Sequence, residues 1–480
     1  MDLRPVLFVM GMLLTILAMG MVLPMLADLQ ANSADWKVFL SCIVITLFFG
    51  GSLILSNSGH DLKVNIHQAF LLIVLSWVFI ATFGALPFYL CELKLSFADS
   101  IFETMSGITT TGSTVITNLE EAPRGILLWR GILQWFGGIG IILMAMSVLP
   151  FLNVGGMQIF RTELSESEKV LPKAAKLASS IGMIYTGLTV ICAFCYGLAG
   201  MGMFDSVVHA LTTISTGGYS TFDTSFGHYN DPWTEIVAII FMIVGGMPFV
   251  LYLQALRGNN RPLFEDQQVH FFLGVVFSSI FILTVYLVLH QDINLIEAIR
   301  RSSFNVVSLV TGTGYVNGDY GAWGGFAVSL LFFLMVVGGC AGSTSCGIKI
   351  FRFQVLIEVV SLQIKKLLFP NGVFIPHYNR RPMANDIPQS VMGFFFLYAL
   401  CFSLLAISLS FTGLDFLSAM SGAATVISNV GPGLGEIIGP TGTFASIPDS
   451  AKWICTVGML VGRLEIFPMI VLFSPHFWRN

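Results

Sequence analysis

Charged residues are scarce in this sequence of 480 residues. Asp, Glu, Lys and Arg together make up 10% of it, and no run of basic residues is longer than two. A typical soluble domain carries roughly 25% charged residues, so the composition excludes an ordinary soluble globular protein. The absence of basic clusters also leaves nucleic-acid binding without support.

Patterns typical of catalysis and of metal binding are missing as well. The sequence has no phosphate-binding Gly-x-x-x-x-Gly-Lys-Ser/Thr pattern, no His-Glu-x-x-His pattern and no carboxylate pair arranged for acid–base chemistry. Cys192 and Cys195 have the spacing of a redox or metal-binding pair, but no His, Asp or Glu lies beside them, and we interpret them as packing residues. No small-residue cleavage site follows the first apolar run, so a cleaved signal peptide is not expected. The sequence therefore predicts that this chain is not an enzyme.

Long hydrophobic runs are abundant. Hydrophobic residues make up 55% of the sequence, and its mean hydropathy is +0.82. A helix that crosses lipid needs about 20 consecutive apolar residues. Residues 7–26 and 38–55 supply the first two such helices, and a polar stretch follows at residues 56–65. The chain is predicted to be an all-α membrane protein that spans the bilayer many times.

Glycine recurs at one position in four short, mostly hydroxyl-bearing stretches. They read Thr-Thr-Thr-Gly-Ser at 109–113, Ser-Thr-Gly-Gly-Tyr at 215–219, Thr-Gly-Thr-Gly-Tyr at 311–315 and Ile-Ser-Asn-Val-Gly-Pro at 427–432. Alignment on Gly112, Gly218, Gly314 and Gly431 gives spacings of 106, 96 and 117 residues. Irregular backbone is tolerated at membrane depth only where it is buried in protein or lines a water-filled path. Four such stretches predict one path built from four similar units.

Each glycine stretch follows an apolar segment too short to span the membrane, and longer apolar segments flank it on both sides. The short segments lie at residues 97–108, 204–214, 295–310 and 414–426. The flanking segments lie at 69–90 and 126–152, at 181–199 and 235–256, at 269–290 and 326–350, and at 391–411 and 452–473. We predict four pseudo-fourfold repeats of helix, pore helix, filter loop and helix around one central pore, with two extra N-terminal transmembrane helices. The expected boundaries are 1–65 for the N-terminal helices and 66–177, 178–266, 267–386 and 387–480 for the repeats.

The distribution of Lys and Arg predicts the orientation, because cytoplasmic loops carry more of both. The loops after the glycine stretches carry two basic residues, Arg124 and Lys452. The loops between successive repeats carry twelve basic residues: Arg161, Lys169, Lys173, Lys176, Arg257, Arg261, Lys349, Arg352, Lys365, Lys366, Arg380 and Arg381. The glycine stretches are therefore expected on the outside and both termini in the cytoplasm. The outer loops then contain Glu120, Glu121, Asp223, Asp231, Asp319 and Glu436. These acids either form a vestibule that concentrates cations or are merely free of the positive-inside bias.

The glycine stretches have the chemistry of an ion selectivity filter. In potassium channels, backbone carbonyls of four loops replace the hydration shell of the ion. Glycine permits the backbone conformations that aim those carbonyls inward, and each short helix directs the negative end of its dipole toward the ion. The alternative is that the glycines pack helices closely where they cross. The candidate filter residues are Thr110, Thr111, Gly112, Thr216, Gly217, Gly218, Gly312, Thr313, Gly314, Asn429, Val430 and Gly431.

With these loops and two additional N-terminal helices, essentially the whole chain resembles the Trk/Ktr/HKT superfamily of potassium transporters, and within it the bacterial TrkH family. Residues 338–349, Gly-Gly-Cys-Ala-Gly-Ser-Thr-Ser-Cys-Gly-Ile-Lys, are similar to a Gly-rich stretch of that family. The resemblance implies that this stretch interrupts the second long helix of the third repeat and forms an intramembrane loop that obstructs the pore below the filter. Cys346 departs from the pattern, since glycine or another small residue is expected there.

The residues of this stretch favour the same interpretation. Each glycine in a helix interior costs roughly 1 kcal/mol relative to alanine, and an irregular segment at membrane depth must line a cavity. A packing kink is the alternative, and Lys349 could equally be a positive-inside anchor. The candidate gate residues are Gly338, Gly339, Gly342, Ser343, Thr344, Ser345, Gly347, Lys349 and Arg463.

Arg463 is expected near the middle of the helix at 452–473, where a charge is costly and normally faces a partner or a cavity. The resemblance implies that Arg463 faces the intramembrane loop and places a positive barrier in the pore. A structural ion pair or a snorkelling side chain is the alternative. Glu465 lies about 200° around the helix from Arg463 and is not expected to pair with it.

The predicted function is potassium-selective uptake across the bacterial inner membrane through a gated, channel-like pore. The carbonyl argument alone indicates a monovalent cation, and potassium comes from the resemblance. In the plant branch of the superfamily, serine at the first filter position accompanies sodium preference, so Gly112 favours potassium. The resemblance also implies a homodimer with one pore per chain and a cytosolic partner resembling TrkA that binds nucleotide and NAD. K+ is then the transported ion, nucleotide is expected only on the partner, and no covalent cofactor is expected.

Two other functions stay open. One is a symporter that moves K+ together with H+ or Na+, and the other is a transporter of ammonium or another small solute. A buried acidic pair facing the pore would favour symport. Glu103, in the first short helix, is the best single candidate, and we interpret it as stabilising the first loop from behind.

Overall fold

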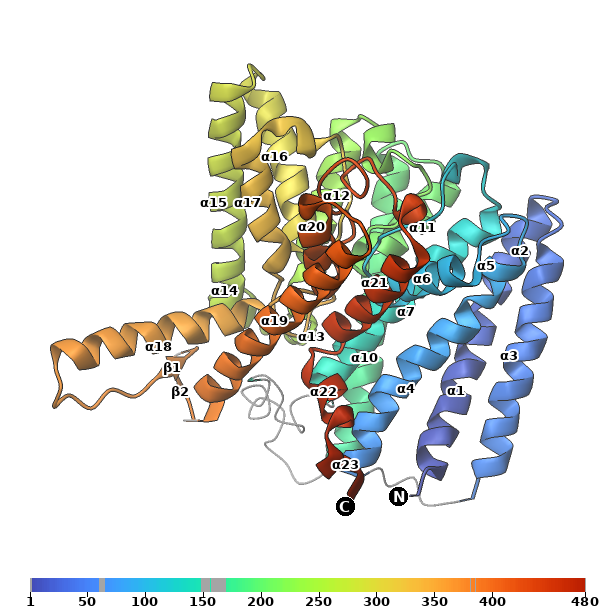
Figure 1. The fold of residues 1–480 in the computed structure, drawn as a ribbon, viewed down its shortest axis with the longest axis horizontal. Coiled ribbons are helices and arrows are strands. Elements are labelled where there is room, and N and C mark those ends of the chain that lie inside the picture. The colour runs from blue at the N-terminus through green and yellow to red at the C-terminus, as the bar shows by residue number, and fades with distance from the viewer. Residues whose placement is uncertain are drawn as a thin grey trace.

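The computed structural model describes residues 2–59, 65–147, 156, 170–379, 381–384 and 386–479. Arg161, Lys169, Arg380 and the end of the helix expected at 126–152 lie outside these residues. The described chain is almost entirely helical (Figure 1). Its only sheet is a two-residue hairpin, in which β1 (His377–Tyr378) pairs with β2 (Arg381–Pro382) in antiparallel fashion.

Helices occupy the first two predicted spans. They are α1 (Arg4–Gly20), continued by α2 (Val22–Gln30), and α3 (Trp36–Asn57), which packs beside α1. The two helices approach each other closely at Gly11, where a Cβ atom would be 2.7 Å from the carbonyl oxygen of Gly50. The buried Asp28 connects this pair to the rest of the protein, since its carboxylate accepts a hydrogen bond from the Gly125 amide at 2.6 Å.

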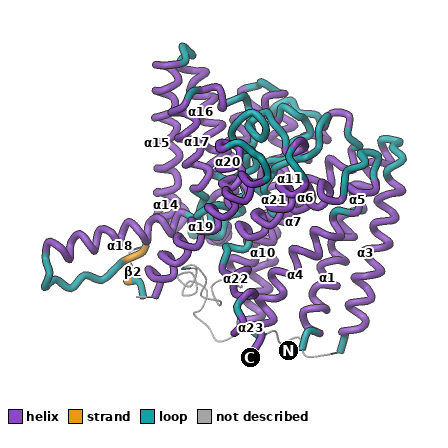
Figure 2. The backbone as a smooth tube through the Cα atoms, in the orientation of Figure 1, coloured by secondary structure: helices purple, strands orange, loops and turns teal. Residues whose placement is uncertain are grey.

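The remaining chain contains four successive sets of helices (Figures 1 and 2). The middle helix of each set has 12 to 16 residues. The first set is α4 (Ile66–Gly84) with α5 (Leu86–Leu90), α6 (Phe97–Ile108) and α7 (Arg124–Ser147); the second is α10 (Val170–Leu198), α11 (Met203–Ile214) and α12 (Pro232–Gly246) with α13 (Phe249–Leu256). The third is α15 (Gln267–His290), α16 (Leu295–Val310) and α17 (Gly325–Val336); the fourth is α19 (Asp386–Phe411), α20 (Phe416–Ser428) and α21 (Asp449–Arg463). Further short helices are α14 (Arg261–Glu265), α22 (Phe467–Phe473) and α23 (Pro475–Arg479), and 3-10 turns lie at Leu119–Glu121, Ser225–His228, Tyr320–Trp323 and Phe444–Ser446.

Three of the four short helices begin at side-chain caps, and α11 begins after Gly202 without one. Ser96, Asn294 and Asp415 accept hydrogen bonds from the backbone amides of the third residues of α6, α16 and α20, respectively. A capping oxygen satisfies an amide that has no partner within the helix. Nearly all of α6 and α20 is buried after the first turn, so their C-terminal ends lie inside the protein.

The helices expected at 235–256 and 452–473 are each bent at a break, whereas the interruption in the third set was expected. α12 and α13 meet at 93°, and α21 and α22 meet at 111°. Pro248 explains the first bend, because proline has no amide hydrogen and disfavours helix at the residue before it. At the second bend, Glu465 and Ile466 have φ of +59° and +65°. In the third set α17 ends at Val336, and the helical path resumes only at α18 (Ile350–Leu368).

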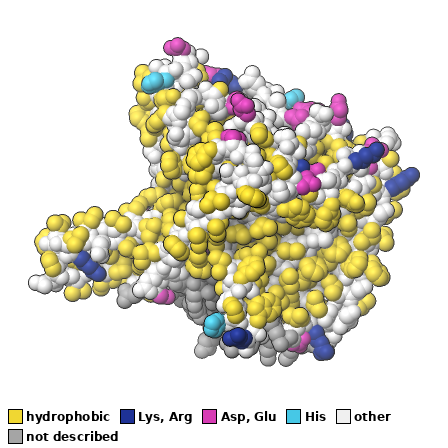
Figure 3. All heavy atoms as spheres, viewed as in Figure 1, with side chains coloured by type: hydrophobic (Ala, Val, Ile, Leu, Met, Phe, Trp, Pro, Cys, Tyr) yellow, Lys and Arg dark blue, Asp and Glu magenta, His cyan; other side chains and the backbone are white. Residues whose placement is uncertain are grey.

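The surface is that of a multi-pass membrane protein. Seven helices of the described chain are long and apolar enough to cross a bilayer, and the two bent pairs would raise the number to nine. Hydrophobic side chains cover most of the face in Figure 3, and the few charged side chains lie mainly toward its upper and lower ends. Both ends of the chain lie at the lower end in Figure 1, where the rings of His67 and Phe477 are 5.1 Å apart.

Candidate functional site

The four aligned glycines form a closed ring. A Cβ atom on Gly112 would lie 2.2 Å from the carbonyl oxygen of Gly217, and one on Gly218 would lie 1.8 Å from that of Thr313. The corresponding distances are 1.9 Å from Gly314 to Val430 and 2.8 Å from Gly431 to Thr111. Each glycine therefore lies against the carbonyl just before the next glycine, and the fourth returns to the first. No side chain fits in these contacts.

The four loops share one backbone conformation although their sequences differ. The glycines have φ between +77° and +114°, and the residue two positions earlier is also left-handed in every loop: Thr110, Thr216, Gly312 and Asn429. The amide just before each glycine donates to the carbonyl five residues earlier. The four bonds run from Thr111 to Ser106, Gly217 to Thr212, Thr313 to Ser308 and Val430 to Thr425, at 2.8, 2.8, 2.8 and 3.1 Å.

The carbonyl acceptors of these four bonds belong to hydroxyl residues that our sequence interpretation missed. Ser106 and Ser308 also donate through Oγ to the carbonyls of Ser113 and Tyr315, at 2.6 and 2.7 Å. Thr425 Oγ1 instead accepts from the Gly431 amide at 2.9 Å. The available signal was the recurrence of Ser or Thr six positions before every aligned glycine. Gln134 on α7 gave no such signal; it donates to the Gly217 carbonyl at 2.6 Å.

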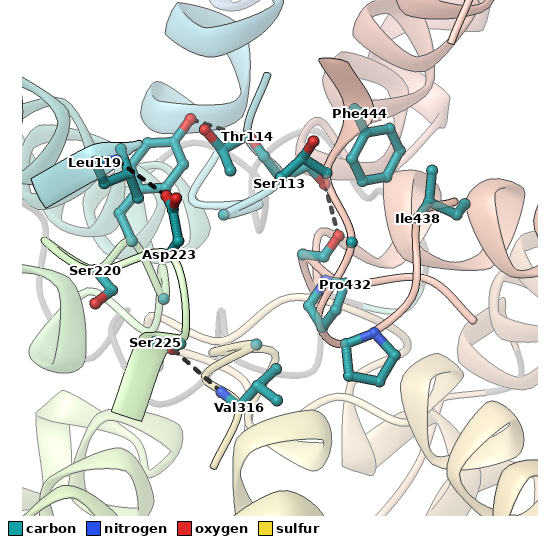
Figure 4. Close-up of a pocket in the computed structure, with 18 of the residues that line it drawn as sticks. Ser113, Thr114, Leu119, Ser220, Asp223, Ser225, Val316, Pro432, Ile438 and Phe444 are labelled. Carbon is teal, nitrogen blue, oxygen red and sulfur yellow. Dashed lines mark hydrogen bonds between the residues drawn. The ribbon is translucent and has the colours of Figure 1, made fainter. Parts of the chain in front are cut away.

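On one side of the ring the protein is hollowed into a vestibule. All four glycines line it, together with residues that follow them in each loop (Figure 4). Ser113 of the first loop reaches the Gly431 carbonyl of the fourth at 2.7 Å, and Ser225 accepts from the Val316 amide at 3.3 Å. The loops thus hold one another around the opening.

Of the six acids expected outside, Asp223 lines the vestibule. Its carboxylate accepts from the amides of Asn118 and Leu119, at 2.8 and 3.0 Å. Asp231 and Asp319 instead cap α12 and the turn at Tyr320–Trp323. The vestibule is therefore less acidic than a count of outer carboxylates suggests.

On the opposite side of the ring lies the Gly-rich stretch between α17 and α18. The Gly338 amide donates to the Ile348 carbonyl and the Ile348 amide to the Val336 carbonyl, both at 3.0 Å. The chain therefore leaves α17 after Val336 and comes back to the end of α17 at Ile348. A Cβ atom on Gly338 would lie 1.8 Å from the Cys346 carbonyl oxygen, so this close return requires glycine. Ser345 Oγ accepts from the Gly339 amide at 3.1 Å inside the turn.

This stretch contacts the ends of the short helices and the loops that follow them. Thr344 Oγ1 donates to the carbonyls of Ile214 at 3.0 Å and Gly245 at 2.9 Å. Thr216 Oγ1 donates to Thr344 Oγ1 at 3.3 Å, and the Cys346 thiol lies 3.6 Å from Thr110 Oγ1. The stretch therefore lies directly against the first two loops, on the side away from the vestibule.

The structure brings Arg463 to the same place. Its guanidinium donates to the Gly137 carbonyl at 2.9 Å and to the Thr344 carbonyl at 3.4 Å, and it also contacts the Cys346 thiol. Arg463 is buried, but it is the last residue of α21 and does not lie in the middle of a continuous helix. Lys349 is also buried and donates to the Ser345 carbonyl, so it is not a surface anchor.

Two of the basic residues counted in cytoplasmic loops lie in the interior instead. Arg352 and Lys349 are buried, and Arg352 forms an ion pair with Glu465. Glu465 lies beyond the end of α21, so the helical-wheel argument does not apply to it, and its ion pair is with Arg352. Lys452, counted as an outer loop charge, is buried and pairs with Asp99 at 2.6 Å. Loop counts therefore overstate the charge on both sides, because sequence cannot tell a loop charge from a buried one.

Glu103 lies behind the first loop, as we interpreted it. Its carboxylate accepts from the Val115 amide at 2.9 Å and from Thr114 Oγ1 at 3.0 Å, and it is fully buried. Arg130 on α7 donates to it at 2.8 Å. The Glu103 carboxylate is thus held in place by three donors, from Thr114, Val115 and Arg130.

This fold and this loop-built site define a multi-pass membrane transporter. The TrkH family, described as a cation transport protein, matches residues 36–480. The chain is 45% identical to the Trk system potassium uptake protein TrkI of Halomonas elongata over 99% of this chain and 97% of that protein. It is 35% identical to the Trk system potassium uptake protein TrkH of Escherichia coli over the full length of both. The crystal structure of the potassium transporter TrkH from Vibrio parahaemolyticus, 33% identical, covers both chains fully with a TM-score of 0.93. The chain belongs to the TrkH family, and the expected membership of the Trk/Ktr/HKT superfamily is confirmed.

Proposed function

We propose that the protein takes up potassium through a gated, channel-like pore whose filter consists of the four glycine loops. The observation that carries this proposal is the ring, in which every filter glycine lies against a carbonyl of the next loop. Alternating left-handed residues turn successive carbonyls, so that a stack of them can replace the hydration shell of an ion. The C-terminal ends of α6, α11, α16 and α20 add their negative dipole ends. The names of the relatives as potassium uptake proteins support potassium as the ion.

In this proposal the repeats at 66–177, 178–266, 267–386 and 387–480 surround one pore with pseudo-fourfold symmetry, and residues 1–65 stand outside it. The gate is the Gly-rich stretch at 338–349 with Arg463 against it. Their contacts support this, since a buried guanidinium next to the ring places a positive charge in the path of a cation. Opening then requires the stretch and the guanidinium to separate.

We also propose the setting in which this pore operates. The protein lies in the bacterial inner membrane with the vestibule outside and the termini in the cytoplasm. It forms a homodimer with one pore per chain, and a cytosolic partner resembling TrkA carries the nucleotide and moves the gate. A membrane potential on the order of 150 mV favours entry of one charge by about 3.5 kcal/mol. That energy supports roughly 300-fold accumulation, so the pore needs no coupled ion.

Reversal potentials of the purified protein in planar bilayers test this function. Opposed KCl and NaCl solutions should give a reversal potential near that of potassium, and a change of pH at fixed potassium should leave it unchanged. Movement with pH would contradict the channel and support symport with H+. Equal permeability to ammonium and potassium, without block by caesium or barium, would contradict potassium selectivity.

A further inference from the structure

A second set of equivalent positions lies in the short helices, nine residues before each filter glycine. The residues there are Glu103, His209, Asn305 and Gly422. The three polar ones are completely buried and reach the chain that follows the glycine of their own loop. His209 Nε2 lies 3.1 Å from Ser220 Oγ, and Asn305 Nδ2 donates to Asn317 Oδ1 at 2.7 Å. This position therefore braces the outgoing part of three loops.

Of these three buried contacts, the one at the first loop includes an ion pair. Glu103 receives Arg130 Nε at 2.8 Å, and the two side chains are 0% and 1% exposed. His209 and Asn305 reach their own loops through neutral groups. Hydrogen bonds in which both partners are charged are shorter and stronger than neutral ones, and the dry interior strengthens them further. The first loop is thus held more stiffly than the second and third.

Arg130 extends this brace to the second loop. Its Nη1 donates to the Ser220 carbonyl at 2.8 Å, and its guanidinium lies 4.0 Å from the centroid of the Tyr219 ring. Tyr219 returns the contact, because its hydroxyl donates to the Glu103 carbonyl at 2.8 Å. The ion pair and the tyrosine therefore fasten the first two loops to each other.

Two other junctions of the ring are held by neutral hydrogen bonds. Tyr315 Oη and Thr212 Oγ1 lie 2.5 Å apart between the third loop and the second short helix, and Ser113 Oγ donates to the Gly431 carbonyl at 2.7 Å between the first and fourth loops. Ion pairs also join Lys452 to Asp99 and Arg300 to Glu235 in neighbouring sets of helices. The pair of Glu103 and Arg130 differs from them because both of its side chains bond to the chain that follows a filter glycine, at Val115 and at Ser220.

We propose that Glu103 and Arg130 are specificity-determining residues that act by positioning. They set the separation of the first and second filter loops, so that their carbonyls keep the spacing of the larger cation and do not close around the smaller one. Selectivity depends on the number and arrangement of the carbonyl dipoles and on how freely they move. The pair touches no ion, and this inference rests on the proposed filter function.

Matched substitutions test the pair. Glu103→Gln keeps the shape of the side chain and removes its charge, and Arg130→Lys keeps the charge and loses the forked geometry that reaches both partners. Each should lower the K+/Na+ permeability ratio, taken from reversal potentials, by about tenfold, which corresponds to about 1.4 kcal/mol. The control is Glu297→Gln on α16, whose ion pair with Arg301 at 2.6 Å is partly solvent-exposed, with the Glu297 side chain 27% and the Arg301 side chain 42% exposed. It should leave the ratio within about twofold of the parent, because exposed pairs contribute little.

A permeability ratio does not depend on how many molecules fold, so it separates selectivity from stability. Lower flux with an unchanged ratio in Glu103→Gln and Arg130→Lys would overturn the inference and leave the pair a structural role. If the single variants do not accumulate in the membrane, the double variant Glu103→Gln with Arg130→Met decides, since it leaves no buried charge unpaired. An unselective parent, or an unchanged ratio in Gly112→Ser, would instead refute the proposed filter.

Discussion

Serine in place of Gly112 perturbs the proposed filter at a contact whose geometry is known. A Cβ atom there would lie 2.2 Å from the carbonyl oxygen of Gly217, and real Cβ contacts are essentially never shorter than 3.0 Å. The Gly217 carbonyl, itself a candidate ligand, must therefore move by at least the difference, 0.8 Å. The residue would also keep φ near +84°, which costs an L-amino acid about 1–2 kcal/mol.

These two effects predict a loss of selectivity in Gly112→Ser. If the strain of about 1.4 kcal/mol appears as distortion of the ion site, the K+/Na+ permeability ratio falls by about tenfold. The assay is the reversal potential under opposed potassium and sodium gradients. The control is Gly187→Ser on α10, where a Cβ atom meets nothing within 4 Å and the backbone is helical. A ratio in Gly112→Ser equal to that of the parent would remove Gly112 from the filter and refute the reasoning.

Three further predictions concern the proposed gate and the bend between α21 and α22. Arg463→Ala, or deletion of residues 339–345, should raise rubidium flux into proteoliposomes without any partner protein, and flux that stays low would contradict the gate. Thr344→Val removes the hydroxyl hydrogen that the carbonyls of Ile214 and Gly245 share, a loss of about 0.5–1.5 kcal/mol, and should raise the same flux by less than Arg463→Ala. Glu465→Gln leaves Arg352 buried without its carboxylate, so the thermal unfolding temperature in detergent should drop, with a cost of about 3–5 kcal/mol. An unchanged unfolding temperature would show that the pair contributes no stability.

The sequence alone was enough to predict the helices and the register of the four loops. Spans such as 7–26 and 38–55 follow from the length of their apolar runs, which is a local property. The alignment on Gly112, Gly218, Gly314 and Gly431 was also local, because each glycine must adopt a left-handed backbone that other residues avoid. The break after Val336 was predictable for a similar reason, since glycine is costly inside a helix.

Our sequence interpretation missed both bends, although Pro248 marks the first, and the sequence could not show which buried charges pair. The break after Arg463 lies between Gly462 and Pro468. The left-handed conformation of Glu465 and Ile466 within it is unusual for these residue types and could not be read from the sequence. Arg352 looked like a loop charge until its pairing with Glu465, 113 residues away, placed it in the interior. Such pairs depend on which helices pack together.

Sequence by itself therefore determined that this chain spans a membrane many times and carries four similar glycine loops. Only the tertiary structure decided that the loops close into a ring, each glycine against a carbonyl of the next, and that Glu103 and Arg130 fasten two of them. The free energy of burying an apolar run in lipid and the cost of a left-handed backbone each depend on one segment alone. Both can therefore be predicted from the sequence. The ring and the ion pair are contacts between segments far apart in the chain, and their geometry exists only after the helices have packed.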